Sequence, residues 1–125
     1  MPEKATITRA RRDKRAGKAP STQAGEFVRE EMHHIREGKH GARSTKQAIA
    51  IGLSKARRAG VHLGRPPAGA KATTKQSAAS ASRAARRGAR RRSPRRSRAI
   101  RAALKREGRT AASRKSLARQ ARTSA

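Results

Sequence analysis

The chain has 125 residues, of which 35 are Lys or Arg and only 7 are Asp or Glu, so its formal net charge is +28. Such an excess of positive charge opposes compaction but attracts polyanions, so the expected partner is nucleic acid and not a membrane. The absence of cysteine excludes a disulfide framework and a thiolate metal site. With no apolar run near the roughly 20 residues of a membrane span and no secretory signal, we expect a cytoplasmic protein.

Residues 1–20 hold seven basic and two acidic residues. Thr8 can cap a short helix that stops at Gly17, but Ile7 is the only large apolar residue nearby. Pro20 closes the segment, because the residue before a proline is pushed out of helical geometry. We interpret residues 1–20 as a basic N-terminal arm.

Residues 21–63 contain the candidate core, since nine of the chain's 14 Ile, Leu, Val, Phe and Met residues lie there. A first helix is predicted from Ser21 or Thr22 to about Glu37. Its apolar face carries one carboxylate, that of Glu31, and burial of an unpaired carboxylate is very costly. Two outcomes are open: Glu31 pairs with a Lys or Arg of the following helix, or it reaches solvent from the edge of the face.

A second helix is predicted over the sequence S-T-K-Q-A-I-A-I-G-L-S-K-A-R-R-A-G, which runs from residue 44 to residue 60. Ser44 and Gln47 form a capping box, in which each side chain satisfies a backbone N–H at the helix start. Gly60 supplies the left-handed stop. The residues that follow the spacing of one buried face are Ile49, Gly52, Leu53 and Ala56.

The connection between these helices, residues 38–43, is short and predicts an antiparallel hairpin. The fold class we expect is therefore mainly α, a small helical hairpin with long basic tails that are largely disordered. The stability of such a hairpin alone is marginal. Formation of a homodimer through the hairpin, or docking of a third helix on it, would bury more apolar surface. Ile51 points away from the predicted core and marks one of these two contacts.

The same connection is a candidate anion site, because Gly38, Gly41 and three basic side chains precede a helix N-terminus, where free N–H groups favour negative charge. The alternative is that the glycines only make the turn and the charges are solvated. The basic residues concerned are Lys39, His40 and Arg43.

The remainder of the chain is dominated by Ala, Arg, Ser and Lys. Few apolar residues and a high net charge predict a disordered linker over residues 64–96. Residues 97–125 form a basic tail with two helix-capable stretches, one capped by Ser97 and ending before Gly108, the other capped by Ser113. We expect these helices to form fully only on binding or on docking to the hairpin.

No catalytic constellation is recognisable, and we expect neither an enzyme nor a cofactor. Residues 52–55 lack the glycine spacing of a phosphate-binding loop. No acid or cysteine completes a metal-ligand spacing with the four histidines, so no metal site is predicted. His33 with Glu37 and His34 with Glu30 are expected as ordinary pairs on a helix surface.

The basic residues favour duplex DNA over RNA, because no aromatic side chains interleave them and stacking platforms for single strands are therefore missing. We expect a sequence-nonspecific, histone-like nucleoid-associated protein that neutralises phosphate. Two alternatives remain, a ribosome- or RNA-associated structural protein and a protein-interaction adaptor. The candidate nucleic-acid-binding residues are Lys39, Arg43, Lys55, Arg57, Arg58, Arg83, Arg86, Arg87, Arg90, Arg91, Arg92, Arg95, Arg96 and Arg98.

Two short stretches resemble known families. The sequence Ser93-Pro94-Arg95-Arg96 resembles the S-P-(K/R)-(K/R) units in the tails of linker histones and sperm histones, which implies a backbone or minor-groove contact in DNA. The stretch K-Q-A-I-A-I-G-L-S-K-A-R-R-A-G is similar to a family of small, basic bacterial proteins that is uncharacterised. That resemblance implies a bacterial origin, hence the bacterial nucleoid, and transfers no activity.

Overall fold

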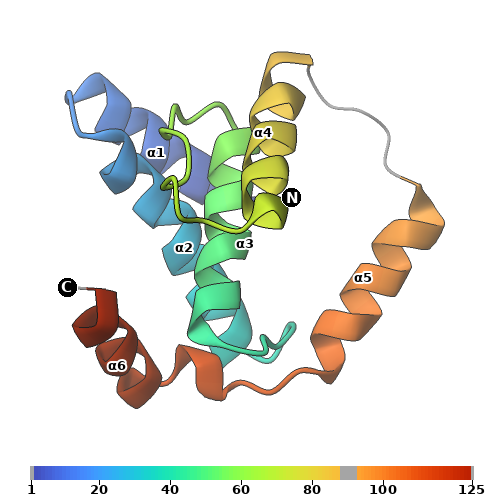
Figure 1. The fold of residues 1–125 in the computed structure, drawn as a ribbon. Coiled ribbons are helices and arrows are strands. Elements are labelled where there is room, and N and C mark those ends of the chain that lie inside the picture. Colours follow the sequence, from blue (N-terminus) through green and yellow to red (C-terminus); the bar gives the residue numbers. More distant parts are fainter. Residues whose placement is uncertain (1, 88–92, 125) are drawn as a thin grey trace.

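The computed structural model describes residues 2–87 and 93–124, and all regular structure in this part of the chain is helical (Figure 1). The prediction of a mainly α protein is confirmed. None of the described helices is long and apolar enough to cross a membrane. The elements are α1 (Lys4–Arg15), α2 (Pro20–Arg36), α3 (Thr45–Arg58), α4 (Ala72–Arg87), α5 (Pro94–Arg106), the 3₁₀ helix η1 (Thr110–Ala112) and α6 (Arg114–Ser124).

Helix α3 begins and ends as its sequence predicts. The Ser44 hydroxyl accepts a hydrogen bond from the Gln47 backbone N–H, and the Gln47 side chain accepts one from the N–H of Arg43. The return bond thus reaches one residue further back than in a standard capping box. Gly60 has φ of 97°, the left-handed conformation expected of a helix stop.

Helix α2 ends as predicted but begins differently. Gly38 has φ of 79° and stops the helix. At the other end the predicted caps, Ser21 and Thr22, lie inside the helix; Pro20 is its first residue and no side chain caps it. Proline suits this position because its fixed φ is already helical and its missing N–H would have had no partner.

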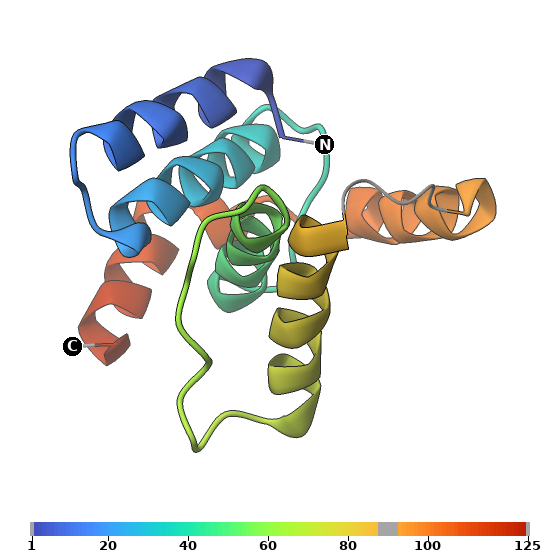
Figure 2. The same cartoon turned by 90° about the horizontal axis from the view of Figure 1, so that it is seen from above.

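Helix α1 packs along α2, so residues 1–20 are not a free arm (Figure 2). The helix starts at Lys4, well before the predicted cap at Thr8, and buries the side chains of Thr6 and Ala10. The Arg9 guanidinium also donates to Glu26 of α2 at 2.8 Å. The two buried residues of α1 are small, which explains why a count of large apolar residues does not predict the contact.

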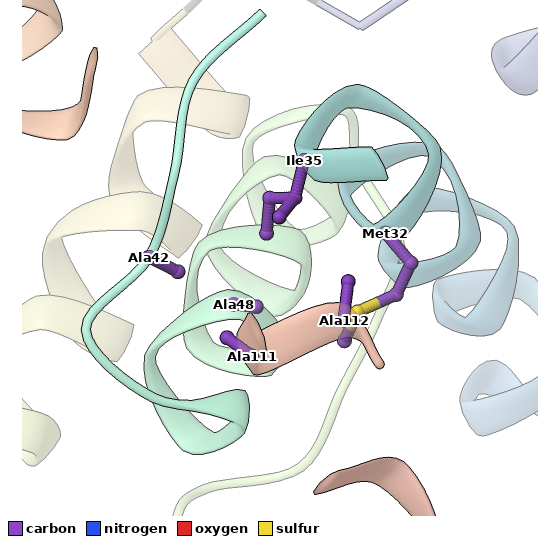
Figure 3. Close-up of a cluster of buried hydrophobic side chains, with 6 residues drawn as sticks. All are labelled: Met32, Ile35, Ala42, Ala48, Ala111 and Ala112. Carbon is purple, nitrogen blue, oxygen red and sulfur yellow. The ribbon is translucent and has the colours of Figure 1, made fainter. Parts of the chain in front are cut away.

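Two clusters of buried side chains form the core, and each joins α2 to α3. One contains Ala24 and Phe27 of α2, Ala56 of α3 and Ala10 of α1. The other, drawn in Figure 3, joins the end of α2 to the start of α3 and to η1. Its members are Met32, Ile35, Ala42, Ala48, Ala111 and Ala112.

The C-terminal strap, residues 107–113, closes the second cluster from outside. Ala111 and Ala112 are buried in it, and the Thr45 hydroxyl donates a hydrogen bond to the Ala111 carbonyl. The Arg36 guanidinium donates to the Ala112 carbonyl at 3.1 Å. A segment with no large apolar residue thus becomes part of the core, because alanine and backbone groups fit between α2 and α3.

The structure differs from the expected disorder of residues 64–96, because it places α4 against α3. Ala78 and Ala81 of α4 are buried. Helix α5 behaves oppositely: it buries no residue and packs against no other described helix, and it projects from the body in Figures 1 and 2. Helix α6 returns to η1 and α3, and its Leu117 packs on the second cluster.

Candidate nucleic-acid interface

Helix α5 presents an exposed basic surface. Six of its 13 residues are Arg or Lys and none is acidic. At 100° per residue, Arg95, Arg98, Arg101 and Lys105 fall on one face, with Arg106 at its edge. Ile100, which is 53% exposed, lies on the opposite side. The helix therefore offers one continuous cationic face that no other part of the described chain covers.

The start of α5 is the sequence Ser93-Pro94-Arg95-Arg96. The Ser93 hydroxyl accepts a hydrogen bond from the Arg96 N–H at 3.5 Å, and Pro94 is the first helical residue. The helix cap is therefore Ser93 and not the predicted Ser97, and the four residues form a helical turn. Arg95 and Arg96 point outward and are exposed.

Other predicted binding residues lie on α4 or outside the described residues. Arg83, Arg86 and Arg87 are exposed on the last turns of α4. Arg90, Arg91 and Arg92 fall within the part of the chain that the structure does not describe.

Two predicted binding residues of α3 are turned toward the protein itself. Lys55 forms an ion pair with the fully buried carboxylate of Glu31. Arg57 donates hydrogen bonds to the carbonyls of Leu63 and Gly64. Arg58 is exposed and makes no hydrogen bond or ion pair with the described residues. On α3, Arg58 alone of the three keeps its charge available to a ligand.

The predicted anion site in residues 38–43 is largely occupied by the protein. The N–H groups of Gly41 and Ala42 donate to the carbonyls of Leu104 and Gly108, at 2.7 and 3.0 Å. A Cβ on Gly41 would lie 1.9 Å from the Glu107 carbonyl oxygen, so this glycine allows the C-terminal strap to approach closely. The glycine is needed for packing, and the N–H groups of Gly41, Ala42, Arg43 and Gln47 are already bonded within the protein.

The remaining cations of this connection have carboxylate partners. Lys39 lies 3.6 Å from Glu3 and 3.4 Å from Glu37, and Arg43 lies 4.0 Å from Glu107. All of these side chains except Glu107 are more than half exposed, so the pairs are loose and compete weakly with phosphate.

A second group of arginines, which the sequence does not single out, gathers around the strap. Arg36, Arg109 and Arg114 line a shallow surface hollow at the start of α6, together with Ala112 and Ser113. The three side chains come from α2, the strap and α6, so only the folded chain brings them together. Guanidinium groups beside a helix N-terminus are chemically suited to phosphate.

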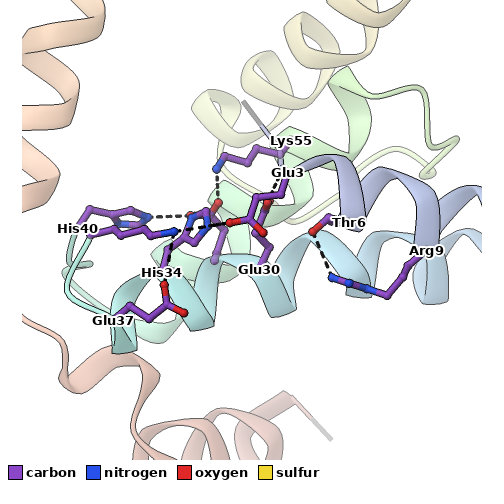
Figure 4. Close-up of polar contacts among 10 residues, drawn as sticks. Glu3, Thr6, Arg9, Glu30, His34, Glu37, His40 and Lys55 are labelled. Carbon is purple, nitrogen blue, oxygen red and sulfur yellow. Dashed lines mark hydrogen bonds and ion pairs between the residues drawn. The ribbon is translucent and has the colours of Figure 1, made fainter.

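Four of the seven acidic residues lie in a polar cluster between α1, α2 and the connection after α2 (Figure 4): Glu3, Glu30, Glu31 and Glu37. Glu31 is fully buried and bonds both Lys55 and His40, which confirms the predicted pair with the following helix. The predicted pairs of His34 with Glu30 and His33 with Glu37 do not form: His34 bonds Glu3 at 3.1 Å instead. Because α1 docks on α2, the Glu3 carboxylate lies closer to His34 than the predicted partner Glu30 does.

The charge state of Glu3 reflects these neighbours. The hydrogen bond from His34, aided by the positive charge of Lys39, holds the pKa of the Glu3 carboxyl below its ordinary value, against a smaller opposing effect of desolvation. The carboxylate form, which accepts the hydrogen bond from His34, is therefore favoured.

Comparison with known proteins identifies one similarity. A family of unknown function (DUF6496) matches residues 11–68, from within α1 through α3 to the segment before α4. No curated protein and no solved structure matches the chain. The match therefore covers most of the helical core and leaves out α4, α5, the strap and α6, and it brings no activity with it.

Proposed function

We propose that the protein binds duplex DNA without sequence specificity, as a histone-like, nucleoid-associated protein that neutralises phosphate. The observation that supports this most strongly is the cationic face of α5, which is exposed along its whole length and has no acidic residue. The helix buries no residue against the rest of the described chain, and a polyanion is the partner that suits its charge.

The dimensions and chemistry of α5 fit a DNA groove. Thirteen helical residues span roughly 20 Å, and the major groove, about 12 Å wide, admits a helix. Arginine offers forked, permanently charged donors that suit phosphate oxygens. The chain has one aromatic residue, Phe27, and it is buried, so bases of a single strand find no stacking surface.

We further propose that different segments of the chain have different roles, one in folding and the other in DNA binding. Helices α2 and α3 act as the antiparallel hairpin that organises the fold, since the buried clusters connect Ala24 with Ala56 and Ile35 with Ala48. The basic segments on the C-terminal side become fully ordered on DNA. In support, α4 buries only two alanines and α5 buries nothing. Such a protein would work in the bacterial nucleoid.

Fluorescence anisotropy with labelled duplexes tests this function. Two DNA duplexes of unrelated sequence are expected to bind equally, and engagement of about ten phosphates predicts an affinity loss of roughly 10³- to 10⁵-fold between 50 and 200 mM salt. A double-stranded RNA of matched length separates the alternatives, because tighter binding to RNA would favour a ribosome- or RNA-associated protein. Absence of DNA binding at low salt would contradict the proposal.

A further inference from the structure

Two imidazoles and a buried carboxylate converge away from the basic surface. Glu31 and His34 are three residues apart and share a face of α2, while the turn at Gly38 brings His40 back over that face. The possible ligand atoms of Glu31, His34 and His40 all lie within 4.8 Å of one another. Figure 4 shows the two histidine rings side by side, and their centroids are 6.2 Å apart.

The hydrogen bonds of His40 fix its tautomer. Its Nδ1 lies 2.9 Å from the Gly41 carbonyl oxygen, which can only accept, so Nδ1 carries a proton. Its Nε2 lies 3.0 Å from Oε2 of Glu31, which is also an acceptor when ionised. A hydrogen bond there needs a proton on the ring or on the carboxyl group, and a metal ion bound by both atoms can take the place of that proton. Histidines that bind metals usually donate their other N–H to a carbonyl or carboxylate in this manner.

The neighbouring carboxylate of Glu30 gives a second, independent observation that points to a cation. Its side chain accepts the Glu3 N–H through Oε1, but its Oε2 is buried and has no hydrogen-bond partner among the described residues. Glu30 is 4% exposed, and together with Glu3 and His34 it forms a second group of close ligand atoms. An unpartnered buried carboxylate oxygen is costly, and a nearby cation would remove that cost.

The local charge also favours a divalent cation despite the net charge of the chain. Four carboxylates and two ammonium groups interact in and around the cluster, which leaves a local charge of −2 when the imidazoles are neutral. The groups are Glu3, Glu30, Glu31, Glu37, Lys39 and Lys55. Lys55 bonds Oε1 of Glu31, so Oε2, which among the described residues bonds only His40, is the oxygen that can bind a metal together with that ring.

We propose that Glu31, His34 and His40 bind a divalent transition-metal ion of the type represented by Zn²⁺. Two imidazole nitrogens and one carboxylate oxygen are a ligand set that such ions accept, with a water in the remaining position. Lys55 and the Gly41 carbonyl then orient the carboxylate and the imidazole from behind. The ion links α2 to the connection whose Gly41 and Ala42 bind the C-terminal segment.

Calorimetric titration of Zn²⁺ into the chelator-treated full chain tests the site. We expect one Zn²⁺ per chain and a rise in the unfolding temperature, because a ligand that binds the native state stabilises it. His34→Ala and His40→Ala should each weaken binding by at least the roughly 10- to 100-fold that loss of an outer-shell partner costs. His33→Ala and His62→Ala are matched controls, since both residues are exposed and lie outside the cluster.

A measurement on the wild-type protein tests the site even if the histidine variants fail to fold. Paramagnetic Co²⁺ added to the wild-type chain should broaden the imidazole NMR signals of His34 and His40 before those of His33 and His62. Equal broadening of all four signals, equal loss of affinity in all four variants, or no binding with excess Zn²⁺ would overturn the proposal.

Discussion

Gly52 of α3 lies so close to Val28 of α2 that a Cβ at position 52 would come within 2.7 Å of the Val28 Cα. The contact is with backbone, which cannot rotate away, so the two helices would have to separate. The glycine is therefore required at this contact between α2 and α3, although it is a poor helix former.

The Gly52→Ala variant is expected to be destabilised by about 1–2 kcal/mol, since overpacking costs about 1–3 kcal/mol and the better helix propensity returns at most about 1 kcal/mol. Urea denaturation measures the change. Gly25→Ala is the matched control, because Gly25 lies in α2 with nothing within 4 Å of an added Cβ. It should stabilise the protein by about 0.5–1 kcal/mol; equal effects of the two substitutions would refute the close contact.

The buried ion pair between Glu31 and Lys55 predicts an unusual order of stabilities. Lys55→Met leaves the fully buried carboxylate with only His40, and loss of one partner of a buried pair costs about 3–5 kcal/mol. We expect the lower end, about 3 kcal/mol, because His40 remains. The double variant Glu31→Gln with Lys55→Met should be more stable than Lys55→Met alone. A double variant less stable than the single one would show that the carboxylate is not buried as described.

The contact of Gly41 with residue 107 predicts that Gly41→Ala releases the C-terminal strap, because the new Cβ would overlap the Glu107 carbonyl. Hydrogen exchange of the Ala42 amide reports the release, since this N–H donates to Gly108. Exchange should become faster in Gly41→Ala and remain unchanged in Gly69→Ala, where nothing lies within 4 Å of an added Cβ. Unchanged protection of Ala42 in both variants would argue against a docked strap.

Helix α4 is docked through buried alanine side chains, so a single charged substitution at a buried position is expected to detach it. Ala81 is 1% exposed whereas Ala79 is exposed, so Ala81→Asp should detach α4 and Ala79→Asp should not. A detached helix of 16 residues is marginal in water and should lose helicity. Cα chemical shifts over residues 72–87 measure this loss. Equal shifts in the two variants would mean that α4 does not rest on α3.

Local features of the fold could be predicted from the sequence because they depend on neighbours a few residues apart. The Ser44 cap, the Ser113 cap of α6 and the glycine stops at positions 17, 38 and 60 all appear in the structure. The pairing of Glu31 with the next helix follows from the cost of burying a lone carboxylate.

The features that escaped prediction depend on contacts between residues that lie far apart in the sequence. Thr45 and Arg36 bond Ala111 and Ala112 across separations of 66 and 76 residues, and alanine carries no periodic signal. The His34 and Glu3 contact likewise requires α1 to dock. Sequence spacing therefore placed the histidines on a helix surface, whereas the fold gathers two of them with buried carboxylates.

The central claim is that the cationic face of α5 binds duplex DNA, and matched charge variants test it. The α5 variant carries glutamine at four positions, by the substitutions Arg95→Gln, Arg98→Gln, Arg101→Gln and Lys105→Gln. The control removes the same number of charges from exposed positions of α1, by Arg11→Gln, Arg12→Gln, Lys14→Gln and Arg15→Gln.

The most direct measurement is the slope of log affinity against log salt for each variant on one DNA duplex. Each lost phosphate contact lowers the slope by about 0.9, so the α5 variant should lose about 3 to 4 in slope while the α1 variant stays close to wild type. An α5 variant with the wild-type slope, or an α1 variant that loses as much, would contradict the account.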